Sequence, residues 1–333
     1  MDRIAVIGAG SWGTTVASIA AATTETVLWA RREELAAAIN AKHANPEYLP
    51  DLHLPENLSA THDLERAVVG SEAIVMAVPS HGFRDVFSDV ARYLDPGTPV
   101  VSLTKGIEQK TLARMTEVIV EVMAEHDSTL SGVLTGPNLA AEIVAGQPTA
   151  SVIAMIDRPA CERLQSLFMS PAFRVYTNDD VVGCELAGAL KNVMAIASGM
   201  SDGLGFGDNT RATLLTRALA ELSRLGVALG GRPETFAGLA GMGDLIATCS
   251  SAKSRNHQVG FRLAQGKTLD EIVAEMKMVA EGVKTTQSVI GLAERAGVDM
   301  PIATHVGMVL DGVITPREGV LSLMTREAKA EST

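Results

Sequence analysis

One lysine stands alone in a run of small and apolar residues. Lys191, followed by Asn192, interrupts the stretch from Leu186 to Met200. Burial disfavours the charged form of an amine, so a lysine in such surroundings has a lowered pKa and can transfer a proton near neutral pH. Composition alone favours a plainer interpretation, in which the side chain extends its ammonium group to water.

Polar residues that follow this run could complete a site. Asp244 and Thr248 are four residues apart, so on a helix they share one face. Asp244 could orient Lys191, or it could cap a helix. The sequence Ser254-Arg255-Asn256 comes soon after, and an arginine there offers charge and a fork of donors suited to a phosphate group.

A glycine loop near the N-terminus indicates a dinucleotide site. Gly8-Ala9-Gly10-Ser11-Trp12-Gly13 matches G-x-G-x-x-G and directly follows a short apolar run. Gly8 allows a tight turn, Gly10 lets the backbone approach a pyrophosphate, and Gly13 permits close helix–strand packing. The start of the next helix directs N–H groups and partial positive charge at the anion. The alternative is a glycine-rich turn that binds nothing.

Two arginines follow the second predicted strand. Many NAD-binding folds carry an acidic residue there, which holds the ribose 2′-hydroxyl, whereas the guanidinium groups of Arg31 and Arg32 suit a 2′-phosphate. The sequence therefore favours NADP(H). Glu33 and Glu34 come next and could serve NAD(H) instead, and a solvated arginine pair at a sheet edge is a further alternative.

The elements that must position these residues change character near residue 179. Before it, short apolar runs alternate with segments of helical spacing, which predicts βαβ units and a parallel sheet covered on both faces. The predicted strands are 3–7, 26–30, 73–78, 99–103, 131–135 and 150–155, and helices are predicted at 11–22, 33–41 and 110–126. After it, helices are predicted at 181–200, 210–229, 268–277, 285–296 and 317–328. We expect a Rossmann-type α/β domain over residues 1–178 and an all-α domain over 179–333.

Composition limits the function classes. The chain has 333 residues, of which 47% are hydrophobic and 20% charged, as expected of a globular protein with two domains. Its 28 basic and 39 acidic residues give a net charge of −11, which argues against a nucleic-acid binder. A local cationic pocket could still bind an anion.

The cysteines, the histidines and the apolar stretches suggest a compartment. Three cysteines form no CxxC and seven histidines form no HExxH, so we expect no metal site. Sparse cysteines suit a reducing compartment. The N-terminus has no signal-peptide pattern, and the longest apolar stretch is too short to span a bilayer. We expect a soluble, cytoplasmic protein.

These motifs together resemble the bacterial glycerol-3-phosphate dehydrogenase [NAD(P)+] family. The resemblance runs from Gly8 to about Gly312, and its most specific part extends from Gly188-Ala-Leu-Lys-Asn to Gly207-Asp-Asn209. The other matching segments are Asn45 to Pro55, Thr104-Lys105-Gly106, Gly241-Met-Gly-Asp244, Ser254 to His257, and Val279 to Lys284.

The resemblance implies a soluble NAD(P)-dependent oxidoreductase, EC 1.1.1.94. Such an enzyme reversibly reduces dihydroxyacetone phosphate to sn-glycerol 3-phosphate for phospholipid synthesis. Its helical domain would be of the 6-phosphogluconate dehydrogenase C-terminal type. Independently of the resemblance, the apolar character of the helical domain leads us to expect a homodimer. Two alternatives stay open: another two-domain hydroxyacid or ketopantoate-type reductase, and a nucleotide sensor without catalysis.

The resemblance also implies roles for individual residues. Lys191 matches the proton donor and acceptor, Lys105 a substrate-contacting lysine near the cofactor, and Asp244 the acid beside the catalytic lysine. The implied substrate-binding positions are Lys105, Gly136, Asn138, Lys191, Asn192, Asp244, Thr248, Ser254, Arg255 and Asn256. The implied cofactor-binding positions are Gly8, Gly10, Ser11, Trp12, Gly13, Arg31, Arg32, Lys105, Ala140, Arg255, Val279 and Glu281.

One position departs from the family pattern. The family usually carries Gly-Pro-Ser-Phe-Ala or Gly-Pro-Thr-Phe-Ala, whereas this chain has Gly136-Pro-Asn-Leu-Ala140. Asn138 keeps both donor and acceptor capacity. We therefore expect substrate binding to persist with a changed contact geometry.

Overall fold

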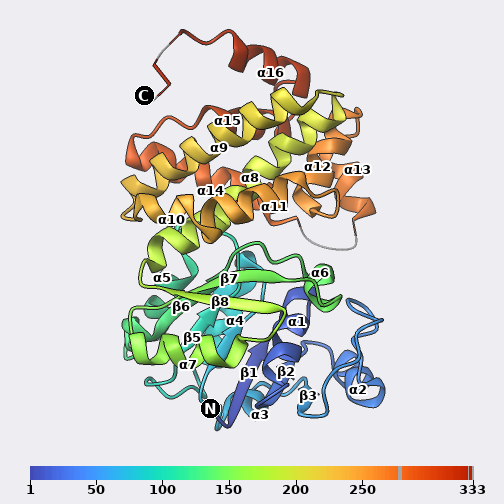
Figure 1. The fold of residues 1–333 in the computed structure, drawn as a ribbon, viewed down its shortest axis with the longest axis vertical. Helices are drawn as coiled ribbons and strands as arrows, with labels where there is room; N and C mark the ends of the chain where they lie inside the picture. Colours follow the sequence, from blue (N-terminus) through green and yellow to red (C-terminus); the bar gives the residue numbers. More distant parts are fainter. Residues whose placement is uncertain (277–279, 329, 332–333) are drawn as a thin grey trace.

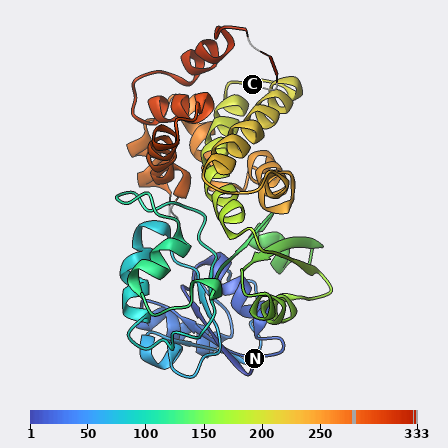
Figure 2. The same ribbon diagram turned by 90° about the vertical axis from the view of Figure 1, so that its left-hand side faces the viewer.

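The structure has one half built on a β-sheet and one half built of helices (Figure 1). The computed structural model describes residues 1–276, 280–328 and 330–331. The last strand ends at Asn178, and the long helix that follows begins at Val181. The two halves are stacked along the long axis, and the two termini lie at opposite ends of the molecule (Figure 2).

A single eight-stranded sheet forms the core of the first half. Its strands are β1 (Arg3–Ile7), β2 (Glu25–Trp29), β3 (Leu58–Thr61), β4 (Ile74–Met76), β5 (Val100–Ser102), β6 (Ser131–Thr135), β7 (Thr149–Ala154) and β8 (Phe173–Asn178). Their order in space is β3-β2-β1-β4-β5-β6-β7-β8. The chain order reverses between β1 and β4, and such a switch point is where an open α/β sheet binds its ligand.

Both faces of the sheet are covered, as the apolar strands predicted. The covering helices are α1 (Ser11–Ala20), α2 (Glu33–Lys42), α3 (Leu64–Val68), α4 (Phe83–Val90), α5 (Met115–Val122), α6 (Ala140–Val144) and α7 (Arg158–Phe168). Alternate residues of β1 enter different cores: Ile4 and Val6 pack with α1, α2 and α7, whereas Ala5 and Ile7 pack with α3, α4 and α5. The predicted fold class, a Rossmann-type α/β half followed by an all-α half, is confirmed.

The sheet is parallel, as predicted, except at one pair of strands. β6 and β7 pair antiparallel, and β8 then pairs parallel to β7. An apolar run predicts a buried strand but carries no information on its direction. Two strands were also missed: β3 has only four residues, and β8 alternates buried with exposed polar residues.

The second half contains only helices among its described residues. They are α8 (Val181–Gly203), α9 (Asp208–Ala228), α10 (Pro233–Ala237), α11 (Asp244–Ser250), α12 (Arg255–Ala264), α13 (Leu269–Glu275), α14 (Glu281–Ala296), α15 (Pro301–Leu310) and α16 (Pro316–Met324), with a π-helical turn at Leu239–Gly243. All five helices predicted for this half are present. The unpredicted ones, α10, α11, α12 and α15, are ten residues or shorter.

Helix α8 is the centre of the helical half. The apolar stretch that we expected to be too short to span a bilayer lies within this 23-residue helix, which by length and composition could cross a membrane. However, 89% of its most apolar window is buried inside the protein. The helices α9, α11, α12 and α14 pack around it. Because a buried core helix passes the same test of length and hydropathy, the apolar character of α8 reflects its central position.

Helices α8 and α12 cross with their backbones in contact. A Cβ on Gly199 would lie 1.9 Å from the carbonyl oxygen of His257, and a Cβ on Gly260 would lie 1.9 Å from that of Ile196. No side chain fits at either position. Paired glycines therefore set the distance between the helix that carries Lys191 and the helix that begins at Arg255.

We predict that Gly260→Ala destabilises the protein by about 3 kcal/mol, because the new methyl group meets backbone that cannot yield without separating the helices. The free energy of unfolding, from denaturant titration, measures the effect. Gly319→Ala is the matched control: a Cβ there finds only ordinary contacts, 3.6 Å or longer, and gains helix propensity. Equal stability of the two variants would contradict the close crossing.

Candidate active site

Two lysines from different halves of the protein meet at one carboxylate. Lys105 follows β5, Lys191 lies in the middle of α8, and Asp244 is the first residue of α11. The Lys105 Nζ lies 2.7 Å from Asp244 Oδ2, and the Lys191 Nζ lies 2.7 Å from Asp244 Oδ1. Their side chains are only 15%, 6% and 2% exposed, so each carboxylate oxygen holds one buried ammonium.

Further hydrogen bonds fix the two ammonium groups. The Lys191 Nζ donates to Thr248 Oγ1 at 2.5 Å, and the Thr248 hydroxyl donates to Asp244 Oδ1 at 3.1 Å. The Lys105 Nζ also donates to the carbonyl oxygen of Gly136 at 2.9 Å. The shared helix face predicted for Asp244 and Thr248 is confirmed, and the option that Asp244 could orient Lys191 is the one that the structure realises.

Small residues deliver Asp244 to this position. The π-helical turn Leu239–Gly243 precedes it, and a Cβ on Gly241 would lie 2.1 Å from the carbonyl oxygen of Phe236. On α8, a Cβ on Gly188 would lie 2.8 Å from Thr135 Oγ1 at the end of β6. Gly241 thus permits the tight turn before α11, and Gly188 lets the middle of α8 approach the end of β6.

Burial shapes the electrostatics of the cluster. The pKa of Lys105 is lowered to about 8, mainly by burial and also by the charge of Lys191, while Asp244 opposes both effects. Burial also raises the pKa of Glu281, against the effects of the Ser80 N–H and of nearby Arg255, Lys105 and Lys191. An amine with a pKa of about 8 is present in both protonation states near neutral pH, as acid–base chemistry requires.

A chain of amides links the cluster to three helices. The Asn192 Nδ2 donates to the carbonyl oxygen of Lys105 at 2.8 Å, and the Asn256 Nδ2 donates to Asn192 Oδ1 at 3.0 Å. The Gly282 N–H then donates to Asn256 Oδ1 at 3.0 Å. The amides therefore fix the positions of α8, α12 and α14 relative to the loop after β5.

The start of α12 carries the residues expected to bind phosphate. The buried Ser254 caps the helix, because its Oγ accepts from the His257 N–H at 3.3 Å. Arg255 opens the helix and is exposed, yet it is near enough to Glu281 to lower the pKa of that carboxyl group. Asn256 is joined to the lysine cluster through Asn192, and Arg255 acts on the same Glu281 carboxyl group as the two lysines. The contacts of Ser254, Arg255 and Asn256 with a ligand stay predictions.

Asn138, the departure from the family pattern, has one end fixed. Its Oδ1 accepts from Ser151 Oγ at 2.6 Å, and its buried Nδ2 has no hydrogen-bond partner among the described residues. Two residues earlier, the carbonyl oxygen of Gly136 holds Lys105. The same Ser151 Oγ lies 3.0 Å from the carbonyl oxygen of Thr135, so this hydroxyl ties the Asn138 amide to the end of β6.

The glycine loop fits the pyrophosphate of a dinucleotide. Gly8 has φ +125°, and a Cβ on it would lie 2.5 Å from the carbonyl oxygen of Ala77, while a Cβ on Gly13 would lie 2.0 Å from that of Gly8. Gly10 instead faces open space, with nothing within 4 Å of a built Cβ. It precedes α1, whose first N–H groups no side chain caps. Open space in front of uncapped N–H groups is what a bound phosphate needs.

A buried asparagine that sequence reasoning missed supports this loop. Asn45 is fully buried, and its Nδ2 donates to the carbonyl oxygen of Ala9 at 2.9 Å and to Thr14 Oγ1 at 2.8 Å. Its Oδ1 accepts from the N–H groups of Glu47 and Tyr48, each at 3.3 Å. The only sequence signal was its place at the start of a segment that resembles the family.

The remaining predicted cofactor positions lie around the same end of the sheet. Ser11 and Trp12 form the first turn of α1, and the Trp12 ring packs edge-on against Phe173. Arg31 and Arg32 follow β2, and Ala140 begins α6, which packs against α1. Val279 lies outside the described residues.

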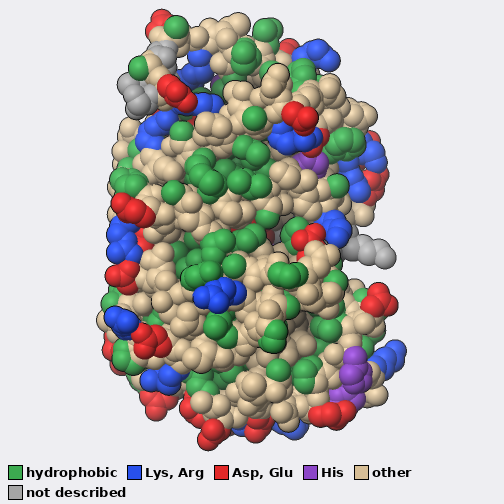
Figure 3. Space-filling model, viewed as in Figure 1, with side chains coloured by type: hydrophobic (Ala, Val, Ile, Leu, Met, Phe, Trp, Pro, Cys, Tyr) green, Lys and Arg blue, Asp and Glu red, His purple; other side chains and the backbone are tan. Residues whose placement is uncertain are grey.

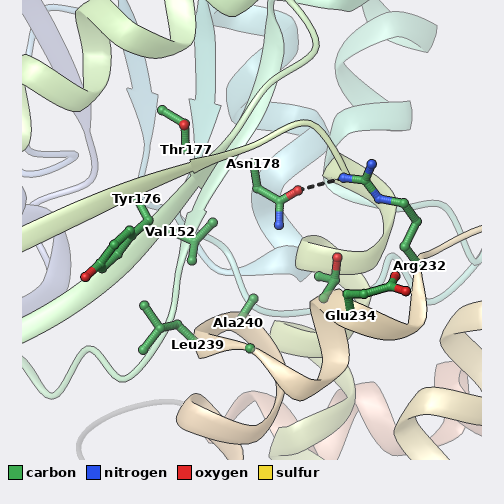
Figure 4. Close-up of a pocket in the computed structure, with 10 residues that line it drawn as sticks. Val152, Tyr176, Thr177, Asn178, Arg232, Glu234, Leu239 and Ala240 are labelled. Carbon is green, nitrogen blue, oxygen red and sulfur yellow. Dashed lines mark hydrogen bonds between the residues drawn. The ribbon is translucent and has the colours of Figure 1, made fainter.

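The predicted site residues do not line the pocket of about 430 Å³ that opens elsewhere along the seam between the halves. Arg232, Thr235 and Leu239 line this pocket with the ends of β7 and β8, and the Arg232 guanidinium donates to Asn178 (Figure 4). In Figure 3, hydrophobic side chains gather near the middle of the long axis, at the level where the two halves meet. Among the described residues, no group of three His, Cys, Asp or Glu side chains is placed to hold a metal ion.

Two family models together match most of the chain. Residues 3–161 match the model described as NAD-dependent glycerol-3-phosphate dehydrogenase N-terminus, and residues 180–321 match the model of the corresponding C-terminus. The enzyme named glycerol-3-phosphate dehydrogenase [NAD(P)+] 2 of Sphingopyxis alaskensis is 55% identical over 310 residues, which cover 93% of this chain and 92% of that enzyme. The one named glycerol-3-phosphate dehydrogenase [NAD(P)+] of Thermobifida fusca is 50% identical and covers 99% of both chains.

Solved structures agree with this similarity. The glycerol-3-phosphate dehydrogenase of Coxiella burnetii superposes with a TM-score of 0.93 at 36% identity and covers 98% of this chain and 99% of that one. A ketopantoate reductase of Ralstonia eutropha, at 16% identity and a TM-score of 0.59 over 96% of this chain and 99% of that one, shares the fold alone.

The cluster geometry makes a prediction about Lys105. Because Asp244 raises its pKa and Lys191 lowers it, Asp244→Asn should shift the pKa of Lys105 downward and Lys191→Met should shift it upward. The pH dependence of acetylation of Lys105, followed by mass spectrometry, reports this pKa. Circular dichroism checks that each variant is folded. Shifts in the same direction for both variants would show that Asp244 does not lie between the two ammonium groups.

Proposed function

Because the chain belongs to the NAD-dependent glycerol-3-phosphate dehydrogenase family, we propose that its lysine cluster is the centre at which a phosphorylated ketone is reduced. The reaction is the reversible NAD(P)H-dependent reduction of dihydroxyacetone phosphate to sn-glycerol 3-phosphate. The observation that carries the assignment of residues is the buried arrangement of Lys105, Asp244 and Lys191 between the two halves. A ketopantoate-type reductase is not favoured, since that likeness is confined to the fold.

In this proposal Lys191 delivers the proton. The ketone of dihydroxyacetone phosphate gains a hydride at carbon and a proton at oxygen, and the nicotinamide supplies the hydride when it is bound. Asp244 and Thr248 each bind one N–H of the Lys191 ammonium, so the third N–H is the one that can donate to the substrate oxygen. Lys105, charged below a pKa of about 8, polarises the same oxygen. In the reverse direction Lys191 accepts the proton from the alcohol.

The phosphate of the substrate is assigned to the start of α12. Arg255 supplies the charge, and Ser254 and Asn256 flank it on the first turn. Asn192, Gly136 and Asn138 complete the substrate pocket. The amide nitrogen of Asn138, which has no partner among the described residues, is a donor to a substrate oxygen. Binding the phosphate away from the reacting carbon lets remote binding energy orient the ketone.

The dinucleotide is assigned to the first half. The loop of Gly8, Gly10 and Gly13 receives the pyrophosphate with the N–H groups at the start of α1, next to Ser11 and Trp12. Arg31 and Arg32 receive a 2′-phosphate, so NADP(H) is preferred to NAD(H). The other residues that we assign to the cofactor are Lys105, Ala140, Arg255, Val279 and Glu281. Residues 1–178 would then be the dinucleotide-binding domain and 179–333 the substrate-binding and catalytic domain.

The cellular setting is part of the proposal too. We infer a cytoplasmic homodimer that supplies glycerol 3-phosphate for glycerophospholipid synthesis and uses no metal. The support, within the residues that the structure describes, is the burial of the long apolar helix α8 and of three free cysteines.

Loss of absorbance from the reduced nicotinamide tests the function. The purified chain should oxidise NADPH, and NADH more slowly, when dihydroxyacetone phosphate is added. Ketopantoate and unphosphorylated dihydroxyacetone, offered at the same concentration, should not support oxidation. Binding of NADPH without oxidation would leave the nucleotide-sensor alternative, and turnover of ketopantoate would overturn the assigned substrate.

We predict that Lys191→Ala lowers kcat by about 10²–10⁴-fold, the usual contribution of a general acid. The dissociation constant of NADPH, from its fluorescence, should stay within twofold of the parent value. Lys267→Ala removes an exposed lysine that pairs with Glu275 far from the cluster and should change neither quantity. An unchanged kcat in Lys191→Ala would remove this lysine from the mechanism.

We also predict that the double variant Arg31→Ala, Arg32→Ala weakens NADPH binding more than NADH binding, by at least about tenfold, because two charge-assisted contacts to a 2′-phosphate are lost. Fluorescence titration with each dinucleotide provides the comparison. Equal weakening of both would mean that the arginines do not contact a 2′-phosphate.

A further inference from the structure

A short segment outside the Rossmann motifs connects the two ends of the proposed dinucleotide site. Asn45 binds the carbonyl oxygen of Ala9 inside the glycine loop and the hydroxyl of Thr14 on α1. The same side chain accepts the N–H of Glu47. Because Asn45 is fully buried with both ends of its amide used, the backbone of Glu47 is fixed relative to the pyrophosphate loop.

From this fixed backbone the Glu47 side chain reaches the other end of the site. Its carboxylate forms a hydrogen-bonded ion pair with Arg32, which follows β2, although the two residues are fifteen positions apart. Both side chains are about half exposed, at 51% for Arg32 and 42% for Glu47. Arg31, in contrast, forms no ion pair with any of the described residues. The two arginines assigned to the 2′-phosphate are therefore unequal: Arg32 already holds a carboxylate.

We propose that Glu47 is the residue that sets the ratio in which this protein uses NADPH and NADH. The inference rests on the proposed contact of Arg31 and Arg32 with a 2′-phosphate. A 2′-phosphate competes with the carboxylate of Glu47 for Arg32, and the negative charge of Glu47 repels it. A 2′-hydroxyl is uncharged and needs no contact with Arg32, so neither effect weakens its binding. Glu47 thus weakens NADPH binding and leaves NADH binding nearly unchanged.

The exposure of the pair fixes the size of the effect. Half-exposed ion pairs are weak, so the incoming phosphate can displace the carboxylate, and the competition changes affinity several-fold rather than by orders of magnitude. The repulsion is also screened by salt, because it acts through water at the surface. The protein therefore binds both dinucleotides and differs only several-fold in its affinity for them.

The test compares Glu47→Gln with a matched control. The variant keeps the shape of the side chain and removes its charge, so the dissociation constant of NADPH should fall about threefold to tenfold and that of NADH should stay within twofold. Adenosine 2′,5′-bisphosphate carries the 2′-phosphate but no nicotinamide. Its dissociation constant should fall by the same factor in Glu47→Gln, and this measurement involves no turnover. In 0.5 M KCl the gain should shrink. The control is Glu56→Gln, which removes an 84% exposed carboxylate that pairs with His43 and should alter neither constant.

The arginine double variant separates the two levels of the argument. If it loses NADPH selectively while Glu47→Gln leaves the ratio of the two dissociation constants unchanged, the inference about Glu47 is overturned and the 2′-phosphate contact stands. If the double variant loses both dinucleotides equally, the contact itself is wrong and the inference falls with it. A gain for NADPH that equals the gain for NADH would also overturn the role of Glu47.

Discussion

One buried carboxylate connects the parts of this protein that have to work together. Asp244 binds an ammonium from the sheet half through one oxygen and an ammonium from α8 through the other. Each charge alone would be costly to bury, and removal of the shared partner would leave two repelling ammonium groups. The positions of α11, α8 and the loop after β5 all depend on this arrangement. Asp244 also limits how far burial and the charge of Lys191 lower the pKa of Lys105.

Glycine is the second constraint, and it acts through distance. The backbones of α8 and α12 touch at Gly199 and Gly260, and the π-helical turn before Asp244 needs Gly241. These contacts bring the lysine helix, the proposed phosphate helix and the carboxylate close enough for short side-chain bonds. The unusual glycine content of the sequence, 30 residues, is thus partly explained by the site rather than by the loops.

The sequence predicted the fold class, the principal strands and the members of the lysine cluster. Periodicity and glycine spacing identified the sheet, and the family resemblance identified Lys105 and Asp244. It did not predict that both lysines share one carboxylate, because side-chain pairing across 139 residues leaves no local pattern. Strand direction at β7 was missed for the same reason. Asn45 and Glu47 were missed because a polar side chain in a non-periodic segment looks the same whether it supports a loop or faces water.

The order of the cluster along the chain has a consequence for biosynthesis. Lys105 and Lys191 leave the ribosome before Asp244 does, and α11 is complete only at Ser250. Until then the two ammonium groups have no common counter-charge, so closing the helical half around them would bury unpaired charge. The sheet half can form as its residues emerge, as N-terminal domains generally do during synthesis. The helical half must wait for the carboxylate, so a nascent chain that stops short of residue 244 has a folded sheet and an open second half.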